Sequence, residues 1–389
     1  ELWSIVGEES GDPVLVRPFS PESPWPLDKL CMKIFTRRFT TQETEMFVAK
    51  SQRISRLTLP KRIFPWIGEE VHKAEFLRVA PEAYEKLRRA ALDAGRVLFP
   101  NLVSITVLDS CSELEPLYDH FGPSLLDVNI NLNLYMSGSR ICETFLDRLR
   151  RNNQFIQFLN IELAPPEVLR DIICTLPNLE RLKTQSSLTA ESLRHLSGLN
   201  TLKNLTCEVN SIPLPSELFS TLTFEALQLL SCQCANVDCA ILLLSMISHC
   251  HLTHLEIGIM CHGTFSTRDD GIASSPLSAQ KHQARQQKWN ELVRAVSKSD
   301  SRTSLISLRI QEHVSNPWGY DVSPLELDSI GPLLAFKSLC ELGFHAASGI
   351  SVKDRDLDIL LQHLPRLKKM NIQPPFVRTP TDQEGQHTW

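Results

Sequence analysis

Residues 202–207 read Leu-Lys-Asn-Leu-Thr-Cys, and residues 227–232 and 252–257 repeat the pattern as Leu-Gln-Leu-Leu-Ser-Cys and Leu-Thr-His-Leu-Glu-Ile. In each phrase the first, fourth and sixth residues are apolar. Counting from residue 102 to residue 252, the starts of the phrases lie 23, 31, 23, 23, 25 and 25 residues apart. A phrase that returns at such spacings indicates a repeat architecture. The other copies begin at Ile54, Leu102, Leu125, Ile156, Leu179, Leu305, Leu339 and Leu367.

Apolar residues that alternate within each phrase predict a short strand, and most phrases are followed by a segment with helical periodicity. In residues 165–176, for instance, two prolines open a turn, and Val168, Leu169, Ile172 and Ile173 line one face. A strand and a helix per repeat predict an α/β solenoid, with a curved parallel sheet and helices outside it. Similar helices are expected at residues 188–196, 237–247 and 352–364.

The composition bounds the possible functions. Of the 389 residues 42% are apolar and 22% are charged, which is typical of a folded protein. The net charge of −5 gives no basic excess for nucleic acid, and no apolar run approaches the ~20 residues that cross a bilayer. Cys207 and Cys232 occupy apolar positions of the phrase, which suits reduced thiols in the cytoplasm or nucleus.

The phrases divide the chain into three parts. Residues 1–50 lack the phrase, are rich in proline and are expected to form a connector or N-terminal cap. Residues 51–375 form the predicted solenoid. The step from residue 252 to residue 305 is about twice the usual length, and we interpret residues 263–281 as a polar loop inserted before a helix at residues 284–296. Residues 376–389 are expected to be a flexible tail.

Residues between the apolar positions of each strand face away from the core. On the predicted sheet they form a mostly polar concave face, which suits protein binding, because interfaces combine polar rims with aromatic or arginine anchors. The alternative is that these residues only keep the strands soluble. The candidate anchors are Phe158, Arg181, His254 and Arg309. The other candidate binding residues are Asn129, Asn131, Asn160, Lys183, Thr206, Glu208, Glu256 and His345.

A cluster of histidines and cysteines at residues 249–262 superficially resembles a metal site. Zinc ligands usually come as two pairs, each with a short spacing. Here Leu252 and Leu255 belong to the phrase, so the spacing of His251 and His254 follows from strand and turn positions. We therefore expect packing, with no metal and no cofactor. The chain also contains no phosphate-binding glycine loop, no Gly-x-Ser-x-Gly elbow and no His-Glu-x-x-His motif, so we do not expect an enzyme.

The phrases resemble leucine-rich repeats over about residues 51–373. The ninth-position asparagine of that family is matched at Asn133 and Asn210 but is replaced elsewhere, for example by Ser187 and Ala235. Long irregular repeats of this kind look like the substrate-recognition part of fungal F-box proteins. Residues 1–3, Glu-Leu-Trp, are similar to the pair with which an F-box often precedes such repeats, and residues 53–59 resemble the first strand phrase that follows.

This narrower resemblance implies an F-box upstream of Glu1 that the sequence lacks. Residues 163–176 also look like the opening of an F-box, but they lie in phase between two phrases, so we predict a repeat helix there. The implied function is that of a substrate-recognition adaptor in an SCF-type ubiquitin ligase, which holds a protein on the concave face. Skp1 and cullin would join only through an upstream F-box.

Two other functions remain open. A leucine-rich-repeat scaffold or inhibitor with no ubiquitin role shares every feature from residue 51 onward. An enzyme, such as a hydrolase, would need a pocket where titratable groups converge, and an open sheet seldom offers one.

Overall fold

The computed structural model describes part of the chain, and the account below is confined to that part. Residues 1–31, Asn131, residues 263–275 and the expected tail at 376–389 lie outside it. The chain divides into two compact units, Glu1–Leu179 and Glu180–Trp389, which are described separately. The described residues are 32–33, 40–59, 78–79, 85, 88–89, 91–93, 95–107, 121–130, 147, 149, 151, 154–162, 164–209, 222–261, 276–314, 324–326 and 331–373.

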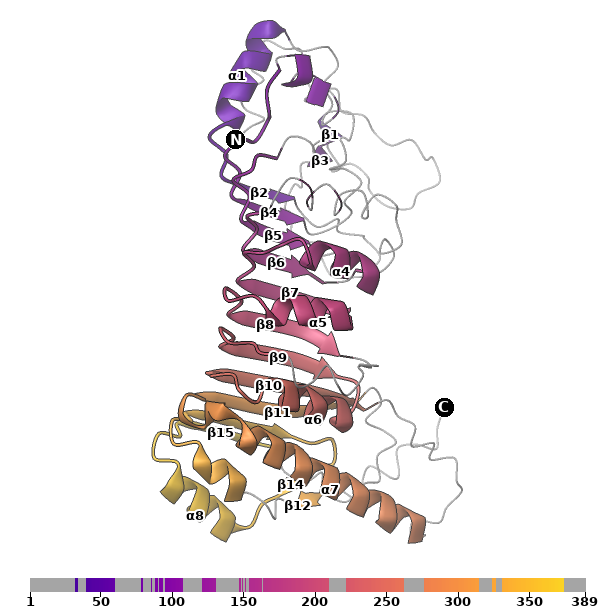
Figure 1. Ribbon diagram of the computed structural model, residues 1–389, viewed down its shortest axis with the longest axis vertical. Coiled ribbons are helices and arrows are strands. Elements are labelled where there is room, and N and C mark those ends of the chain that lie inside the picture. The colour runs from indigo at the N-terminus through magenta and orange to yellow at the C-terminus, as the bar shows by residue number, and fades with distance from the viewer. Residues whose placement is uncertain are drawn as a thin grey trace. The chain divides into compact units, whose positions relative to one another are not determined.

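Within its described residues, the first unit is built on parallel strands that follow one another in chain order. Each strand pairs in register with the next. The strands are β2 (Arg56–Leu59), β4 (Ser104–Val107), β5 (Asp127–Ile130) and β6 (Phe158–Ile161). Helix α1 (Thr41–Ser51) precedes them, helix α4 (Pro166–Ile173) follows them, and β1 (Met32–Lys33) pairs separately with β3 (Arg78–Val79) (Figure 1).

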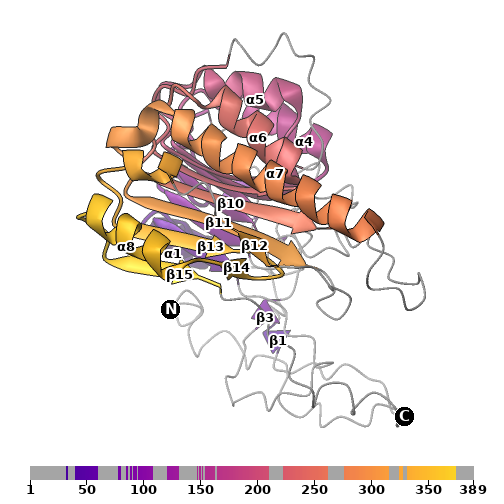
Figure 2. The same ribbon diagram turned by 90° about the horizontal axis from the view of Figure 1, so that it is seen from below.

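The described part of the second unit continues the same plan, again with parallel strands that pair in chain order. They are β7 (Arg181–Ser187), β8 (Asn204–Val209), β9 (Leu229–Cys234), β10 (His254–Cys261), β11 (Ser307–Val314), β13 (Glu341–His345) and β15 (Lys369–Ile372). Figure 2 shows α5 (Ala190–Ser197), α6 (Val237–Met246) and α7 (Pro276–Lys298) along one side of β10 and β11. The remaining elements are η7 (Asp300–Thr303), η9 (Gly331–Ala335), α8 (Asp354–His363) and the pair β12 (Leu325–Glu326) and β14 (Ile350–Ser351).

The strands confirm the phrases. Each predicted phrase starts a strand two residues after its first apolar residue. Burial alternates as expected: on β8, Leu205 and Cys207 are 1% and 2% exposed, whereas Asn204 and Thr206 are partly exposed. The inward Thr184 is also buried, because its hydroxyl accepts a hydrogen bond from Ser186 N at 3.0 Å.

Successive repeats are joined at the second residue of the phrase. Among the described residues, nine such carbonyls each accept two backbone N–H groups from the next repeat, as the two lone pairs of a carbonyl allow. The Glu180 oxygen accepts from Lys203 N at 2.9 Å and Asn204 N at 3.1 Å. The register therefore depends on the phrase and not on the length of the connection. Ser55, Val103, Leu126, Lys203, Gln228, Thr253, Ile306 and Cys340 accept in the same way.

The helices of the repeats begin where capping residues stand. Pro166 occupies the first turn of α4, where its missing N–H costs no hydrogen bond. Thr189 caps α5 by accepting from Ser192 N at 3.2 Å, and Asn236 caps α6 by accepting from Cys239 N at 2.9 Å. Among the described residues, no helix combines the length and the hydropathy needed to cross a membrane.

The prediction for the long insertion is partly wrong. Helix α7 begins at Pro276, so residues 276–281, the end of the predicted polar loop, are helical. This stretch lacks apolar periodicity, but its Ala, Gln and Lys residues favour helix and its proline suits a first turn. The expected apolar face of the helix is confirmed, since Trp289, Leu292, Val293 and Val296 are at most 3% exposed.

Helix α7 is fixed to its unit by a buried ion pair. Arg285 donates to both carboxylate oxygens of Glu312 on β11, and the two side chains are 14% and 4% exposed. Glu312 also accepts from Ala347 N at 2.8 Å, and Arg285 Nη1 donates to Ser348 Oγ at 3.0 Å. These bonds satisfy charges that would otherwise be costly to bury.

Candidate functional site

The side of each sheet opposite the buried apolar side chains is called the open face here. It carries the residues at the third, fifth and seventh positions of the phrase, which are partly or fully exposed apart from two glycines. The structure places Asn129, Phe158 and Asn160 on the open face of the first unit. Arg181, Lys183, Thr206, Glu208, His254, Glu256, Arg309 and His345 lie on that of the second unit.

On the open face of the first unit, side chains of neighbouring strands bond to one another. Asn160 Nδ2 donates to Asn129 Oδ1 at 2.8 Å, and Ser104 Oγ donates to Asp127 Oδ2 at 3.0 Å. The Asn160 Oδ1 atom is buried and has no hydrogen-bond partner among the described residues. An acceptor left in this state favours the approach of a donor.

The centre of the second open face is a hydrogen-bonded row at the fifth position of three strands. Ser231 Oγ on β9 donates to Glu256 Oε2 on β10 at 3.1 Å. Arg309 Nη1 on β11 donates to Glu256 Oε1 at 3.4 Å, and the two side chains are 46% and 36% exposed. Within the described structure this is the one hydrogen bond of the guanidinium, so several of its donors face solvent.

Two glycines make room for the side chains around this row. Gly343 follows Arg309 in register, and a Cβ at Gly343 would lie 3.3 Å from Arg309 Cγ. A Cβ at Gly258 would lie 2.0 Å from Gln233 Oε1. Arg309 and Gln233 therefore lie close over the backbone of the neighbouring strands. The sequence contains the signal for this, namely glycine at an open-face position, but does not show which side chain fills the gap.

The other candidate residues of the second unit are spread over the face and do not form one cluster. His254 Nδ1 lies 2.9 Å from Thr253 Oγ1, which fixes the ring at the start of β10. Arg181 and Lys183 are exposed on β7. His345 on β13 stands opposite Gln311 of β11.

Four cysteines of the second unit belong to the core, namely Cys207, Cys232, Cys234 and Cys250. Cys207 and Cys232 pair in register with their Sγ atoms 3.7 Å apart, and Cys234 Sγ is 3.8 Å from Cys232 Sγ. Hydrogen bonding to the Cys207 and Cys234 thiols, together with burial, raises the pKa of Cys232 well above its usual value. Burial raises the pKa of Cys250 to about 11. The Cys232 and Cys250 thiols therefore stay protonated. Among the described residues no group of three or more His, Cys, Asp or Glu side chains is placed to hold a metal ion.

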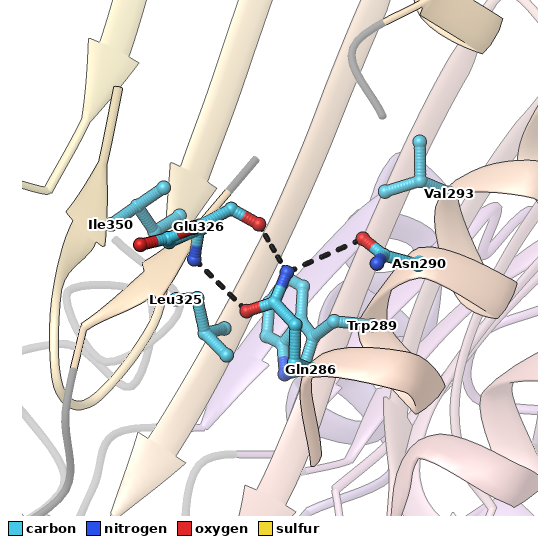
Figure 3. A pocket seen from close by; sticks show the side chains of 7 residues that line it. All are labelled: Gln286, Trp289, Asn290, Val293, Leu325, Glu326 and Ile350. Carbon is cyan, nitrogen blue, oxygen red and sulfur yellow. Dashed lines mark hydrogen bonds between the residues drawn. The ribbon is translucent and has the colours of Figure 1, made fainter. Parts of the chain in front are cut away.

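Figure 3 shows a small hollow between α7 and the pair β12 and β14. Gln286 spans it, since its Oε1 accepts from Glu326 N at 2.9 Å and its Nε2 donates to Glu326 O. The amide therefore fastens β12 to the helix. Glu326 is the one ionisable residue in the lining, so titratable groups do not converge there. The lining residues are Gln286, Trp289, Asn290, Val293, Leu325, Glu326 and Ile350.

Parallel strands in register, each begun by the same phrase and buried on one side, define an α/β leucine-rich-repeat solenoid. No protein-family model matches the chain, and no curated protein matches it.

Similar solved structures include a chain from the crystal structure of the Rad7 and Elc1 complex in yeast, at 13% identity and a TM-score of 0.39, covering 86% of this chain and 79% of that one. Another is an internalin, InlF, from Listeria monocytogenes, at 12% identity and a TM-score of 0.33, covering 89% of this chain and 92% of that one. At these values of sequence identity and TM-score, the assignment of the fold class rests on the strand register and the burial pattern of this chain alone.

Proposed function

We propose that the chain binds a protein ligand on its open face and acts as the substrate-recognition adaptor of an SCF-type ubiquitin ligase rather than as a catalyst. The observation that carries the binding part is the row Ser231, Glu256 and Arg309 in the second unit. Glu256 holds the guanidinium in place through one long hydrogen bond. The remaining donors are available to a carboxylate or a backbone carbonyl of a ligand.

The surroundings of this row suit a protein rather than a small molecule. Arginine is enriched among the residues that dominate protein interfaces. The face around Arg309 is polar, and the side chains over Gly258 and Gly343 lie close to the backbone. Small ligands favour concave, mostly apolar pockets instead.

The ligase part of the proposal is supported by the resemblance of residues 1–3 and 53–59 to the start of F-box repeat proteins. An adaptor needs no catalytic group of its own, because other subunits transfer the ubiquitin. A scaffold without a ubiquitin role would use the same open face, so the two functions are separated by experiment.

The binding part is tested by immobilising the full chain, identifying retained proteins, and measuring the affinity of each against three versions. We expect Arg309→Ala to weaken binding of a true ligand at least about tenfold, which is about 1.4 kcal/mol. Arg302→Ala, at an exposed arginine of η7, is the matched control and should bind as wild type. Equal affinity of all three versions for every retained protein would exclude this row as the site.

The ligase part is tested with the full-length protein and purified Skp1. Retention of Skp1, followed by ubiquitin transfer to the ligand found above, is the expected result. Failure to retain Skp1 would remove the ligase role and leave the binding role intact.

A further inference from the structure

The first unit carries an apolar edge that the open face does not include. We call it the strand-start edge and define it by Arg53, Val103, Leu126 and Phe155, which come from successive repeats just before the strands begin. Phe155 is 57% exposed, the largest fraction among the large apolar residues that the structure describes, and Val103 is 37% exposed. Exposed apolar residues that gather in this way mark interaction sites.

The backbone aligns Val103 and Leu126 with Ser55 and Gln157, and Arg53 and Phe155 lie two residues before these two. Val103 N donates to Ser55 O at 2.8 Å, Leu126 N to Val103 O at 2.9 Å, and Gln157 N to Leu126 O at 2.8 Å. Each step is one strand spacing, about 4.8 Å. Arg53 joins the edge because Asn101 Nδ2 binds the adjacent Gln52 O at 2.8 Å, and Phe155 lies two residues before Gln157.

The charged side chains near the strand-start edge are all positive among the described residues given next. Described residues 52–55, 95–103, 121–126 and 154–157 include Arg53 and Arg96 but no carboxylate. Val103 and Leu126 are the second residues of their phrases, and the same positions before β7 to β10 hold Glu180, Lys203, Gln228 and Thr253, with Lys203 and Glu180 paired at 3.0 Å. The next two phrases have Ile306 and Cys340 at their second positions. Each of these phrases is preceded by a serine and not by an aromatic residue. An apolar edge beside arginine is therefore a feature of the first unit and not of the repeat in general.

We propose that the strand-start edge docks an acidic amphipathic helix of a partner protein. One helical turn rises about 5.4 Å, close to the strand spacing of about 4.8 Å. Apolar residues one turn apart on such a helix would meet Val103 and Leu126, and a further apolar residue at the end of the helix would reach Phe155, which lies two residues before the aligned Gln157. A carboxylate on the helix would pair with Arg53, because unlike charges at an interface fix register and exclude basic partners. The edge works independently of the open face.

The test uses a fluorescent peptide of about fourteen residues, about four turns, with that apolar stripe flanked by glutamates. Two control peptides have lysine in place of glutamate, or the same residues with the stripe scattered. We expect Phe155→Ala to raise the Kd of the glutamate peptide at least tenfold, and Arg53→Glu to reverse the preference toward the lysine peptide. Both side chains are exposed, so both variants should fold, which circular dichroism checks.

Leu361→Ala, at a leucine of α8 that is 55% exposed, is the matched apolar control and should leave the Kd unchanged. Arg309→Ala should also leave it unchanged, which separates this proposal from the open-face function. Equal binding of the stripe and scattered peptides, or no effect of Phe155→Ala and Arg53→Glu, would overturn the proposal. So would wild-type self-association that Phe155→Ala abolishes, since the edge would then join two copies of the chain.

Discussion

At the scale of the residue, alternation along a strand makes neighbouring positions unequal. Leu205 is 1% exposed in the core, whereas the next residue, Thr206, lies on the open face. We expect Leu205→Asp to destabilise the second unit by several kcal/mol, on the order of 3 to 5, because it buries an unpaired charge. Thr206→Asp should cost far less. Urea unfolding measures both free energies, and equal losses would mean that the two faces are assigned wrongly.

The same alternation of buried and exposed positions determines which part of the candidate site can be predicted from the sequence. The phrase alone places Glu256 and Arg309 at open-face positions of their strands, and the structure confirms that placement. It does not predict that Arg309 leans over Gly343 or that Ser231 shares Glu256. Those contacts depend on rotamers and on which strands are neighbours, and neither is encoded in the spacing of one phrase.

At the scale of the element, α7 depends on Arg285. We expect Arg285→Ala to destabilise the second unit by roughly 3 to 5 kcal/mol, because it removes the guanidinium that pairs with Glu312, whose side chain is 4% exposed. Arg294→Ala removes an exposed arginine from the same helix and should change stability by less than about 0.5 kcal/mol. Urea unfolding of both variants, followed by circular dichroism, checks the difference. Similar losses would mean that the ion pair does not anchor the helix.

The strands and helices also show where apolar periodicity in the sequence does not predict the structure. The phrase predicts the register of the strands, because it must bury its apolar side chains on one face, but each strand begins two residues after its phrase does. The start of α7 was predicted too late, because residues 276–283 lack an apolar stripe and hold their helix through propensity and the anchoring at Arg285. The helical residues 91–93 likewise end before Gly95, at a place that no apolar pattern marks. That glycine has φ 60°, and its N–H bonds Leu92 O while Arg96 N bonds Ala91 O, both at 2.9 Å.

At the scale of the whole molecule, repeats that contact only their neighbours should lose structure from the ends. In the second unit β15 is the terminal strand, paired with β13 alone among the described residues. Its inward Met370 is 37% exposed. We therefore expect amides of β15 to exchange with deuterium well before those of β9 and β10, by mass spectrometry of native protein. Equal protection of the three strands would indicate that the unit opens all at once.

The paired hydrogen bonds on the second carbonyl of each phrase also bear on how such a chain evolves. Connections of very different length, from residues 207 to 227 and from 257 to 305, lead into the same bonding pattern. Selection can therefore lengthen, shorten or duplicate what lies between two phrases without disturbing the neighbouring strands. The protein can acquire new surface segments by simple insertion, and its inherited constraint is confined to six residues per repeat.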